Sequence, residues 1–246
     1  MVICLYFHLG EFFMNRKDYI SEVIYSSAIK EEIEWRKEKG NKHTVRLLDN
    51  MLKEIQALGY NYKYFADITN RDNRDAAVLS ILEAYISKFT DQWIIAELIL
   101  SISITGRKNV TKTVLEYYSK LPDGDEKVYA GFYDNALYRV REKRFIPEYL
   151  DLLKNPKDAV RLPLTMTILG KWKVVEAKQY FIKYLDATIL YLNTSVSDLV
   201  FTSIEALSYY DDTENEIKTL IGKKLEDSDK DVRTAAKKAL KRLSKQ

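Results

Sequence analysis

The segment DSDKDVRTAAKKALKRL, residues 227–243, decides how the rest of the sequence is interpreted. After an acidic start, Val232, Ala236 and Leu240 recur every four residues, which is the spacing of one face of an α-helix. Lysines and arginines fill much of the remaining surface, so the predicted helix has a long basic side. The segment is therefore a candidate for a calcium loop, a nucleic-acid-binding arm, or a structural unit that recurs elsewhere in the chain.

A repeat in the sequence supports the structural unit. The stretches NPKDAVRLPLTMTIL and NTSVSDLVFTSIEAL carry the same pattern, and their valines at 160 and 196 stand 72 and 36 residues before Val232. Apolar residues follow each valine at helical spacing, and the pattern continues more loosely upstream from Val128 and from Ile94. The recurring positions are Leu164 and Ile168, Val200 and Ile204, Phe132 and Ala136, and Leu98 and Ile102.

Each of these helices, which we call helix B, follows another amphipathic segment, helix A. Helices A are expected at 74–88, 109–120, 144–154, 174–186 and 213–225. Neither helix of a pair buries its apolar stripe alone, so successive pairs are expected to stack.

At residues 227–243 the pattern D-x-D-x-x-V-R-x-A-A-x-x-A-L-x-x-L resembles the consensus of HEAT repeats, an armadillo-like helical solenoid family. The unit at 144–170 keeps the turn NPKDAVR, whereas 74–140 and 174–210 match by position only, with Ser197 in place of the arginine. The resemblance implies an all-α, right-handed α–α superhelix of about five HEAT-like helix pairs. It also implies that Arg161 and Arg233 are structural residues between repeats.

The domain organisation expected from these patterns is a single α-solenoid domain over 14–246. Residues 71–246 hold the repeats, and 14–70 form an N-terminal cap of helices that fits no repeat. Residues 1–13, MVICLYFHLGEFF, are expected to be a start-site extension or a disordered, apolar N-terminus. They lack the basic region and small-residue cleavage site of a secretory signal and are too short to span a membrane.

Composition favours a helical protein without cofactors. The chain is 46% hydrophobic and 30% charged, as in soluble globular proteins, and it has only four prolines and eight glycines. The single cysteine, Cys4, excludes a disulfide within the chain and indicates a cytoplasmic protein. Two histidines, His8 and His43, exclude a multi-histidine metal site. A net charge of +3 does not by itself indicate a polyanionic partner.

A calcium loop at the acidic start of the quoted segment is ruled out by two positions. After ligands at Asp227, Asp229 and Asp231, such a loop needs glycine next and glutamate at its twelfth position. Val232 and Lys238 stand there instead. The aspartates are expected to cap the helix, because their side chains can accept hydrogen bonds from unpaired backbone N–H groups.

The favoured function is a non-enzymatic scaffold that binds a macromolecule, most simply a protein, on the concave surface lined by B helices. Tyrosines there would offer large contact areas with a polar tip; alternatively, they seal the seams between repeats. The positions expected to face this groove from helical register are Tyr129, Tyr133, Asp134, Thr165, Phe201, Glu205 and Lys237.

Three alternatives remain open. The basic side of the last helix would contact nucleic acid through Lys230, Lys237, Lys238, Lys241 and Arg242, or it is the polar face that a terminal repeat needs for solubility. Some HEAT-like proteins are alkyl-base DNA glycosylases, which pair an aspartate with aromatic residues. Asp91 with Trp93, or Asp134 with Tyr133, would mimic that pair, but no motif of those enzymes is present, so no catalytic residue is assigned. The third alternative is an immunity protein that neutralises a toxin.

Overall fold

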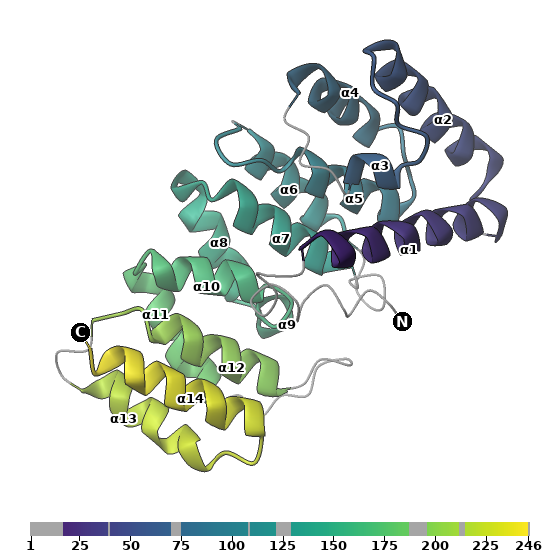
Figure 1. The fold of residues 1–246 in the computed structure, drawn as a ribbon. Coiled ribbons are helices and arrows are strands. Elements are labelled where there is room, and N and C mark those ends of the chain that lie inside the picture. Colours follow the sequence, from purple (N-terminus) through teal and green to yellow (C-terminus); the bar gives the residue numbers. More distant parts are fainter. Residues whose placement is uncertain are drawn as a thin grey trace. The chain divides into compact units, whose positions relative to one another are not determined.

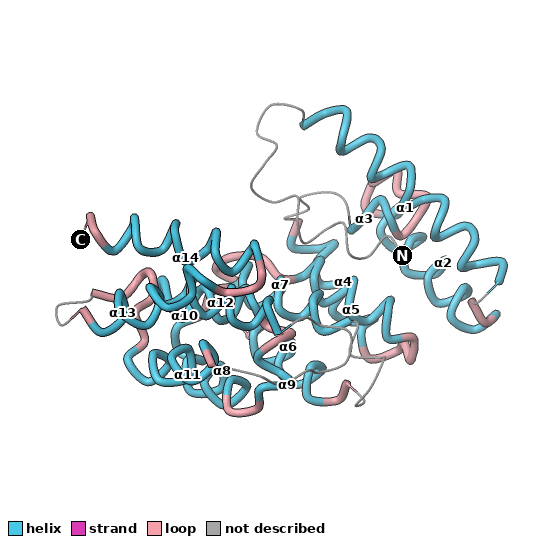
Figure 2. The backbone as a smooth tube through the Cα atoms, turned by 90° about the horizontal axis from the view of Figure 1, so that it is seen from below, coloured by secondary structure: helices cyan, strands magenta, loops and turns pink. Residues whose placement is uncertain are grey.

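The protein is all-helical in a computed structural model, which describes residues 17–38, 40–69, 75–107, 109–121, 129–186, 196–211 and 215–245. Every regular element in these ranges is a helix (Figures 1 and 2), which confirms the predicted all-α class. None of the described helices combines the length and the hydropathy needed to cross a membrane. The expected N-terminal extension, 1–13, and the repeat position Val128 lie outside the described residues.

The described helices belong to two compact units, one from Met1–Ser101 and one from Ile102–Gln246. In the first unit, Trp93 contacts both Trp35 and Phe65, with ring centroids 5.4 and 5.9 Å apart. The buried carboxylate of Glu32 pairs with Arg36, which also pairs with the carboxylate of Asp49 at 2.8 Å. The helices of this unit are α1 (Lys17–Glu38), α2 (Lys42–Ala57), α3 (Ala66–Thr69), α4 (Ala76–Ile86) and α5 (Gln92–Ile102).

The second unit consists of helices packed in pairs. Each of α7, α10, α12 and α14 contacts the next in that order, and Figure 1 shows α10, α12 and α14 side by side. Each also contacts a preceding helix, respectively α6, α8, α11 and α13. Their bounds are α6 (Val110–Ser119), α7 (Ala130–Val140), α8 (Ile146–Leu153), α9 (Pro156–Ala159), α10 (Pro163–Lys171), α11 (Val175–Leu185), α12 (Val196–Leu207), α13 (Glu216–Lys223) and α14 (Lys230–Leu243), with 3-10 turns at Lys143–Phe145 and Lys224–Glu226.

The predicted positions of the helices agree with these elements, and most residues of the apolar stripes are buried, whereas Phe132, Leu164 and Leu240 are half-buried. Val200 and Ile204 of α12 and Val232 and Ala236 of α14 are all at most 4% exposed. The B helices of the second unit are α7, α10, α12 and α14. The side chain of Val196 lies outside the described part of the chain.

One repeat departs from the expected pattern. Val160 was expected to lie within helix B, but it lies in the turn between α9 and α10. The helix begins at Pro163 instead, because proline has no N–H to donate and its fixed φ suits the first helical position. Pro163 therefore starts α10 and does not kink it.

The N-terminus of α10 is capped by the preceding B helix. Its own N-cap residue, Leu162, offers no side-chain acceptor. Instead, the carboxylate of Asp134 on α7 accepts hydrogen bonds from the backbone N–H groups of Leu164 and Thr165, both at 2.8 Å. It also accepts one from the Thr165 hydroxyl at 2.7 Å. A carboxylate at a helix N-terminus satisfies unpaired donors and complements the helix dipole, so this contact fixes α10 against α7.

The next interface, between α10 and α12, depends on a glycine. A Cβ atom at Gly170 would lie 2.6 Å from the carbonyl oxygen and 2.8 Å from the Cα atom of Ala206. Both atoms belong to the backbone of α12, so they cannot move aside as a flexible side chain would. The absence of a side chain at Gly170 thus permits the close approach of the two helices.

Burial of Asp134 makes the stability of the protein depend on pH. Removal from water raises the pKa of this carboxyl from 3.8 to about 7, although the three hydrogen bonds act in the opposite direction. The folded protein therefore holds the proton more tightly than the unfolded chain does. Protonated Asp134 therefore stabilises the folded protein. This contribution is complete below pH about 4 and is lost as the pH rises to about 7.

The prediction concerns the difference between the free energies of unfolding of the wild type and of the variant Asp134→Asn. We expect this difference to fall by about 3 kcal/mol as the pH rises from about 4 to about 7. Urea denaturation of both proteins across this range measures the difference, and other titrating groups cancel from it. A difference that stays constant with pH would contradict the assignment.

Gly170→Ala is expected to destabilise the protein by about 1 to 3 kcal/mol, because the added methyl group forces α10 and α12 apart. Gly222→Ala on α13 is the matched control, since a Cβ there meets no atom within 4 Å. The control should be neutral or stabilising by up to about 1 kcal/mol, as alanine favours helix over glycine. Equal losses in the two variants, measured by urea denaturation, would show that the close approach is unimportant.

Candidate functional site

Three of the residues expected to face a groove are buried. Tyr133, Asp134 and Thr165 have no exposed surface. Asp134 and Thr165 form the α7–α10 cap, and the ring of Tyr133 packs edge-on against Tyr118 at 6.1 Å. The expectation that these three residues contact a partner is wrong, because neighbouring helices cover the faces on which they lie.

The other four lie at the surface. Phe201 is 37% exposed on α12, and Glu205 follows it one turn later on the same side. Lys237 is exposed on α14, and Tyr129 is half-buried at the start of α7 with its ring 6.3 Å from Phe132. Helix α12 is buried on most sides, so Phe201 and Glu205 mark the narrow stripe that it leaves open.

Several tyrosines, none of them among the expected groove positions, connect neighbouring repeats. The hydroxyl of Tyr118 donates to the carboxylate of Asp158 at 3.0 Å. The hydroxyl of Tyr210 donates to the carbonyl oxygen of Val174 at 2.6 Å. The partners in these bonds are 40 and 36 residues apart, roughly one repeat length. These side chains therefore join the helix pairs and are not available to a partner.

The acidic start of α14 has the structural role that the sequence indicated. The side chain of Asp229 accepts hydrogen bonds from the N–H groups of Asp231 and Val232, so it caps the helix. Arg233 donates to the carbonyl oxygens of Asp227 and Ser228. These bonds lie within its own turn, which corrects the expectation that Arg233 acts between repeats.

Apart from the half-buried Arg233, the basic residues of α14 are exposed. They are the candidate nucleic-acid contacts Lys230, Lys237, Lys238, Lys241 and Arg242. Of these, Arg242 differs in its surroundings, because its guanidinium lies over the ring of Tyr209, 4.4 Å from the centroid, and donates to the hydroxyl of Ser208 at 2.6 Å. Arg242 is therefore held against the preceding B helix.

This contact is one step of a larger arrangement, which we call the cation–tyrosine ladder. It consists of Arg141, Tyr138, Lys171, Tyr209 and Arg242, in spatial order. The Nζ atom of Lys171 is 5.7 Å from the ring centroids of both tyrosines, and Arg141 covers Tyr138 at 4.4 Å. Cations within about 6 Å of an aromatic centroid are attracted to the ring.

The carboxyl ends of four successive B helices bring the ladder together. Tyr138 lies in the last turn of α7, Lys171 is the last residue of α10, Tyr209 follows α12, and Arg242 lies in the last turn of α14. The close approach at Gly170 is adjacent to Lys171, which places this lysine between the two rings. Cations also suit helix C-termini, where the carbonyl groups carry partial negative charge.

The ladder was not predicted from the sequence, although a signal for it exists. Tyr138, Lys171, Tyr209 and Arg242 recur at intervals of 33, 38 and 33 residues. Because the residue type alternates between aromatic and basic, a search for identical residues at a fixed period does not find it. Only the adjacency of the helix ends shows that the two types contact each other.

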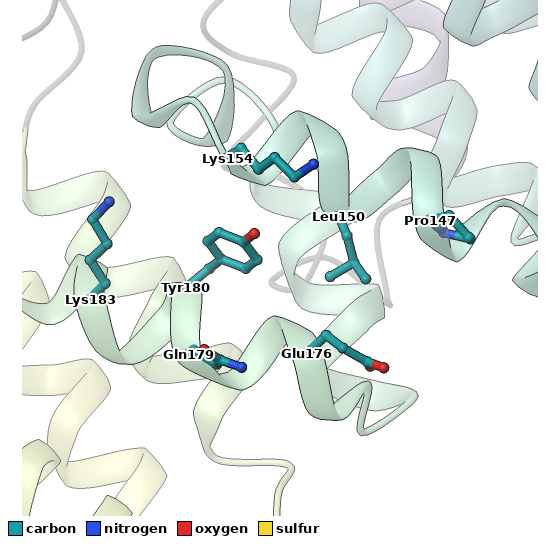
Figure 3. Close-up of a pocket in the computed structure, with 7 residues that line it drawn as sticks. All are labelled: Pro147, Leu150, Lys154, Glu176, Gln179, Tyr180 and Lys183. Atoms are coloured by element: carbon teal, nitrogen blue, oxygen red, sulfur yellow. The ribbon is translucent and has the colours of Figure 1, made fainter.

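A surface groove lies on the other helix layer, between α8 and α11. It has a volume of about 630 Å³ and is open to solvent. Figure 3 shows Tyr180 between Leu150 of α8 and Lys183 of α11. Lys154 at its edge pairs with Asp151 at 2.7 Å, which raises the pKa of this lysine. The lining residues are Pro147, Leu150, Lys154, Glu176, Gln179, Tyr180 and Lys183.

The two carboxylates considered for base excision are engaged in helix capping. Asp91 accepts hydrogen bonds from the N–H groups of Trp93 and Ile94 at the start of α5. Asp134 is fully buried and therefore cannot contact a substrate. Among the described residues, no group of three or more histidine, cysteine, aspartate or glutamate side chains is placed to hold a metal ion.

Comparison with known proteins adds no assignment: no family model, curated protein or solved structure matches this chain significantly.

Tyr210→Phe is expected to lower the free energy of unfolding by about 1 kcal/mol, because it removes one hydrogen bond between repeats. The loss stays small since the carbonyl of Val174 also accepts from the N–H of Ala177. Tyr180→Phe, in the groove of Figure 3, is the control and should change stability little. If urea denaturation gives the same change in the free energy of unfolding for both variants, Tyr210 does not stabilise the contact between repeats.

Proposed function

We propose that the protein is a non-enzymatic scaffold of HEAT-like helix pairs that binds a protein partner on the surface of its B helices. In this proposal the pairs form a right-handed α–α superhelix in the cytoplasm, as the repeat pattern and the single Cys4 suggest. The observation that carries it is the sequential packing of α7, α10, α12 and α14, each with its own preceding helix.

Polar contacts support the proposal because they recur at the repeat distance. Lys173 pairs with Asp211 at 2.7 Å, and Lys178 pairs with Glu216 at 3.0 Å; both pairs are 38 residues apart. Exposed pairs of this kind contribute little stability individually. Together with the buried cap at Asp134, they hold neighbouring pairs in one arrangement, so a partner would meet a surface that is already ordered.

The surface proposed for the partner centres on the exposed stripe of α12. Phe201 supplies an exposed apolar ring, and Glu205 and Lys237 supply charges of opposite sign nearby on α12 and on the adjacent α14. Aromatic side chains surrounded by polar groups often dominate binding energy at protein interfaces. No bond-making or bond-breaking step is part of this proposal.

One observation favours a second candidate, nucleic-acid binding. Five of the six basic residues of α14 are exposed, and such a surface would attract phosphates. A related possibility is a HEAT-like alkyl-base DNA glycosylase, and an immunity protein would share the protein-binding mode with a toxin as partner. Salt separates these candidates, since binding through phosphates weakens steeply as salt is added.

The test is capture from the lysate of the native host at moderate salt with wild-type protein and the variant Phe201→Ala. We expect a specific protein to bind the wild type and to bind the variant at least about tenfold less, as for a buried aromatic contact. Val175→Ala is the control, because Val175 is 74% exposed and belongs to α11, which is not a B helix; it should retain the captured protein.

Two results would contradict the proposal. In the first, the wild type captures only nucleic acid, which is released when salt is raised. In the second, both variants lose the captured protein equally, so that the surface of α12 has no special part in binding.

A further inference from the structure

The cation–tyrosine ladder carries positive charge that the protein itself does not neutralise. In the described part of the chain, none of Arg141, Lys171 and Arg242 pairs with a carboxylate. Lys173, close to Lys171 in sequence, does pair with Asp211. All three ladder cations are exposed, so their remaining N–H groups are available to a partner.

Hydrogen bonds within the protein use only a few of the N–H donors of the ladder cations. Arg141 donates from Nε to the carbonyl oxygen of Tyr138 at 2.8 Å, and Arg242 donates from one nitrogen to Ser208. A guanidinium has five N–H donors and an ammonium has three. The tyrosine rings and these bonds hold the cations in place, which lowers the entropic cost of binding an anion.

The distance between neighbouring ladder cations limits the spacing of the anionic groups that can bind to them. Lys171 and Arg141 share the ring of Tyr138, at 5.7 and 4.4 Å from its centroid, so they lie at most about 10 Å apart. The same limit holds for Lys171 and Arg242 across Tyr209. A chain in the extended polyproline II conformation has three residues per turn and advances about 3.1 Å per residue, so carboxylates at every third residue lie on one side of it, about 9 Å apart.

We propose that the ladder binds an acidic, extended polypeptide segment, with successive carboxylates contacting Arg141, Lys171 and Arg242. The inference rests on the proposed function, because it names the chemistry of the partner's bound segment. Arginine recognises carboxylates through paired N–H donors, and lysine contributes a compact charge between them.

One observation favours a polypeptide over nucleic acid at this site. Cations already cover the faces of Tyr138 and Tyr209, so these rings offer less surface on which bases could stack.

The test uses the full chain and a fluorescent peptide of about 12 residues with glutamate at every third position, separated by glycine and serine. Fluorescence anisotropy gives its Kd. We expect Lys171→Gln to raise this Kd about tenfold, the loss of one charge-assisted contact. A peptide with glutamine in place of glutamate should not bind measurably.

Lys183→Gln is the matched control, since it removes the same charge from α11, in the groove of Figure 3. It should leave the Kd unchanged. Arg242→Lys tests the ladder in a second way: it keeps the charge but removes the guanidinium, and we expect a rise of a few-fold. The side chain of Lys171 makes no hydrogen bond or ion pair with another described residue, so Lys171→Gln should fold normally, which urea denaturation verifies.

Three outcomes would overturn the inference: no binding of the acidic peptide by the wild type, an equal loss in Lys183→Gln, or tighter binding of an oligothymidylate of similar length that depends on Lys171. The lysate experiment separates this failure from that of the proposed function. A captured protein lost by Phe201→Ala but retained by Lys171→Gln would leave the scaffold function standing and remove the ladder from it.

Discussion

The close approach of α10 and α12 at Gly170 is the constraint on which the second unit depends. The backbone of Ala206 leaves no room for a methyl group at this position. Helices packed this closely exclude water and fix each other's rotation, because side chains on both must interdigitate at the density of a protein interior. Lys171 directly follows Gly170 in the sequence, so the close approach of the two helices also places Lys171 between the rings of Tyr138 and Tyr209.

The cap supplied by Asp134 imposes a second constraint of the same kind on the preceding interface. A helix usually provides its own N-cap, and α14 does so with Asp229. Helix α10 begins with a proline and relies on a carboxylate from α7. Its first turn is thus complete only when the neighbouring pair is in place, so the repeats depend on each other through named contacts as well as through apolar burial.

The sequence predicted the helices well, because the apolar period of 3.6 residues is a local property. Val232 and Ala236 are buried as their spacing requires. The prediction was wrong at Val160, where Pro163 sets the start of the helix three residues later than the repeat pattern suggests. In that repeat, the local chemistry of proline prevails over the periodic pattern.

The site was less predictable for a physical reason. Helical register shows which stripe of a B helix faces its own helix A. A B helix inside a stack is also covered on two further sides, by the B helices before and after it. Asp134 and Thr165 therefore lie in an interface although they fall outside the main stripe. The ladder depends on which helix ends are adjacent, a property of the stack that no single helix encodes. Phe201 and Lys237 are at the surface as predicted, and their role in binding stays a prediction.

The central claim is that the B helices and their carboxyl ends form the binding surface. Amide hydrogen exchange of the protein, alone and saturated with its captured partner, tests it most directly. We predict increased protection in α12 and in the segments that follow α7, α10 and α12, with no change around the groove of α8 and α11. Increased protection in α8 and α11, with none along the B helices, would contradict the claim and move the binding surface to the other layer.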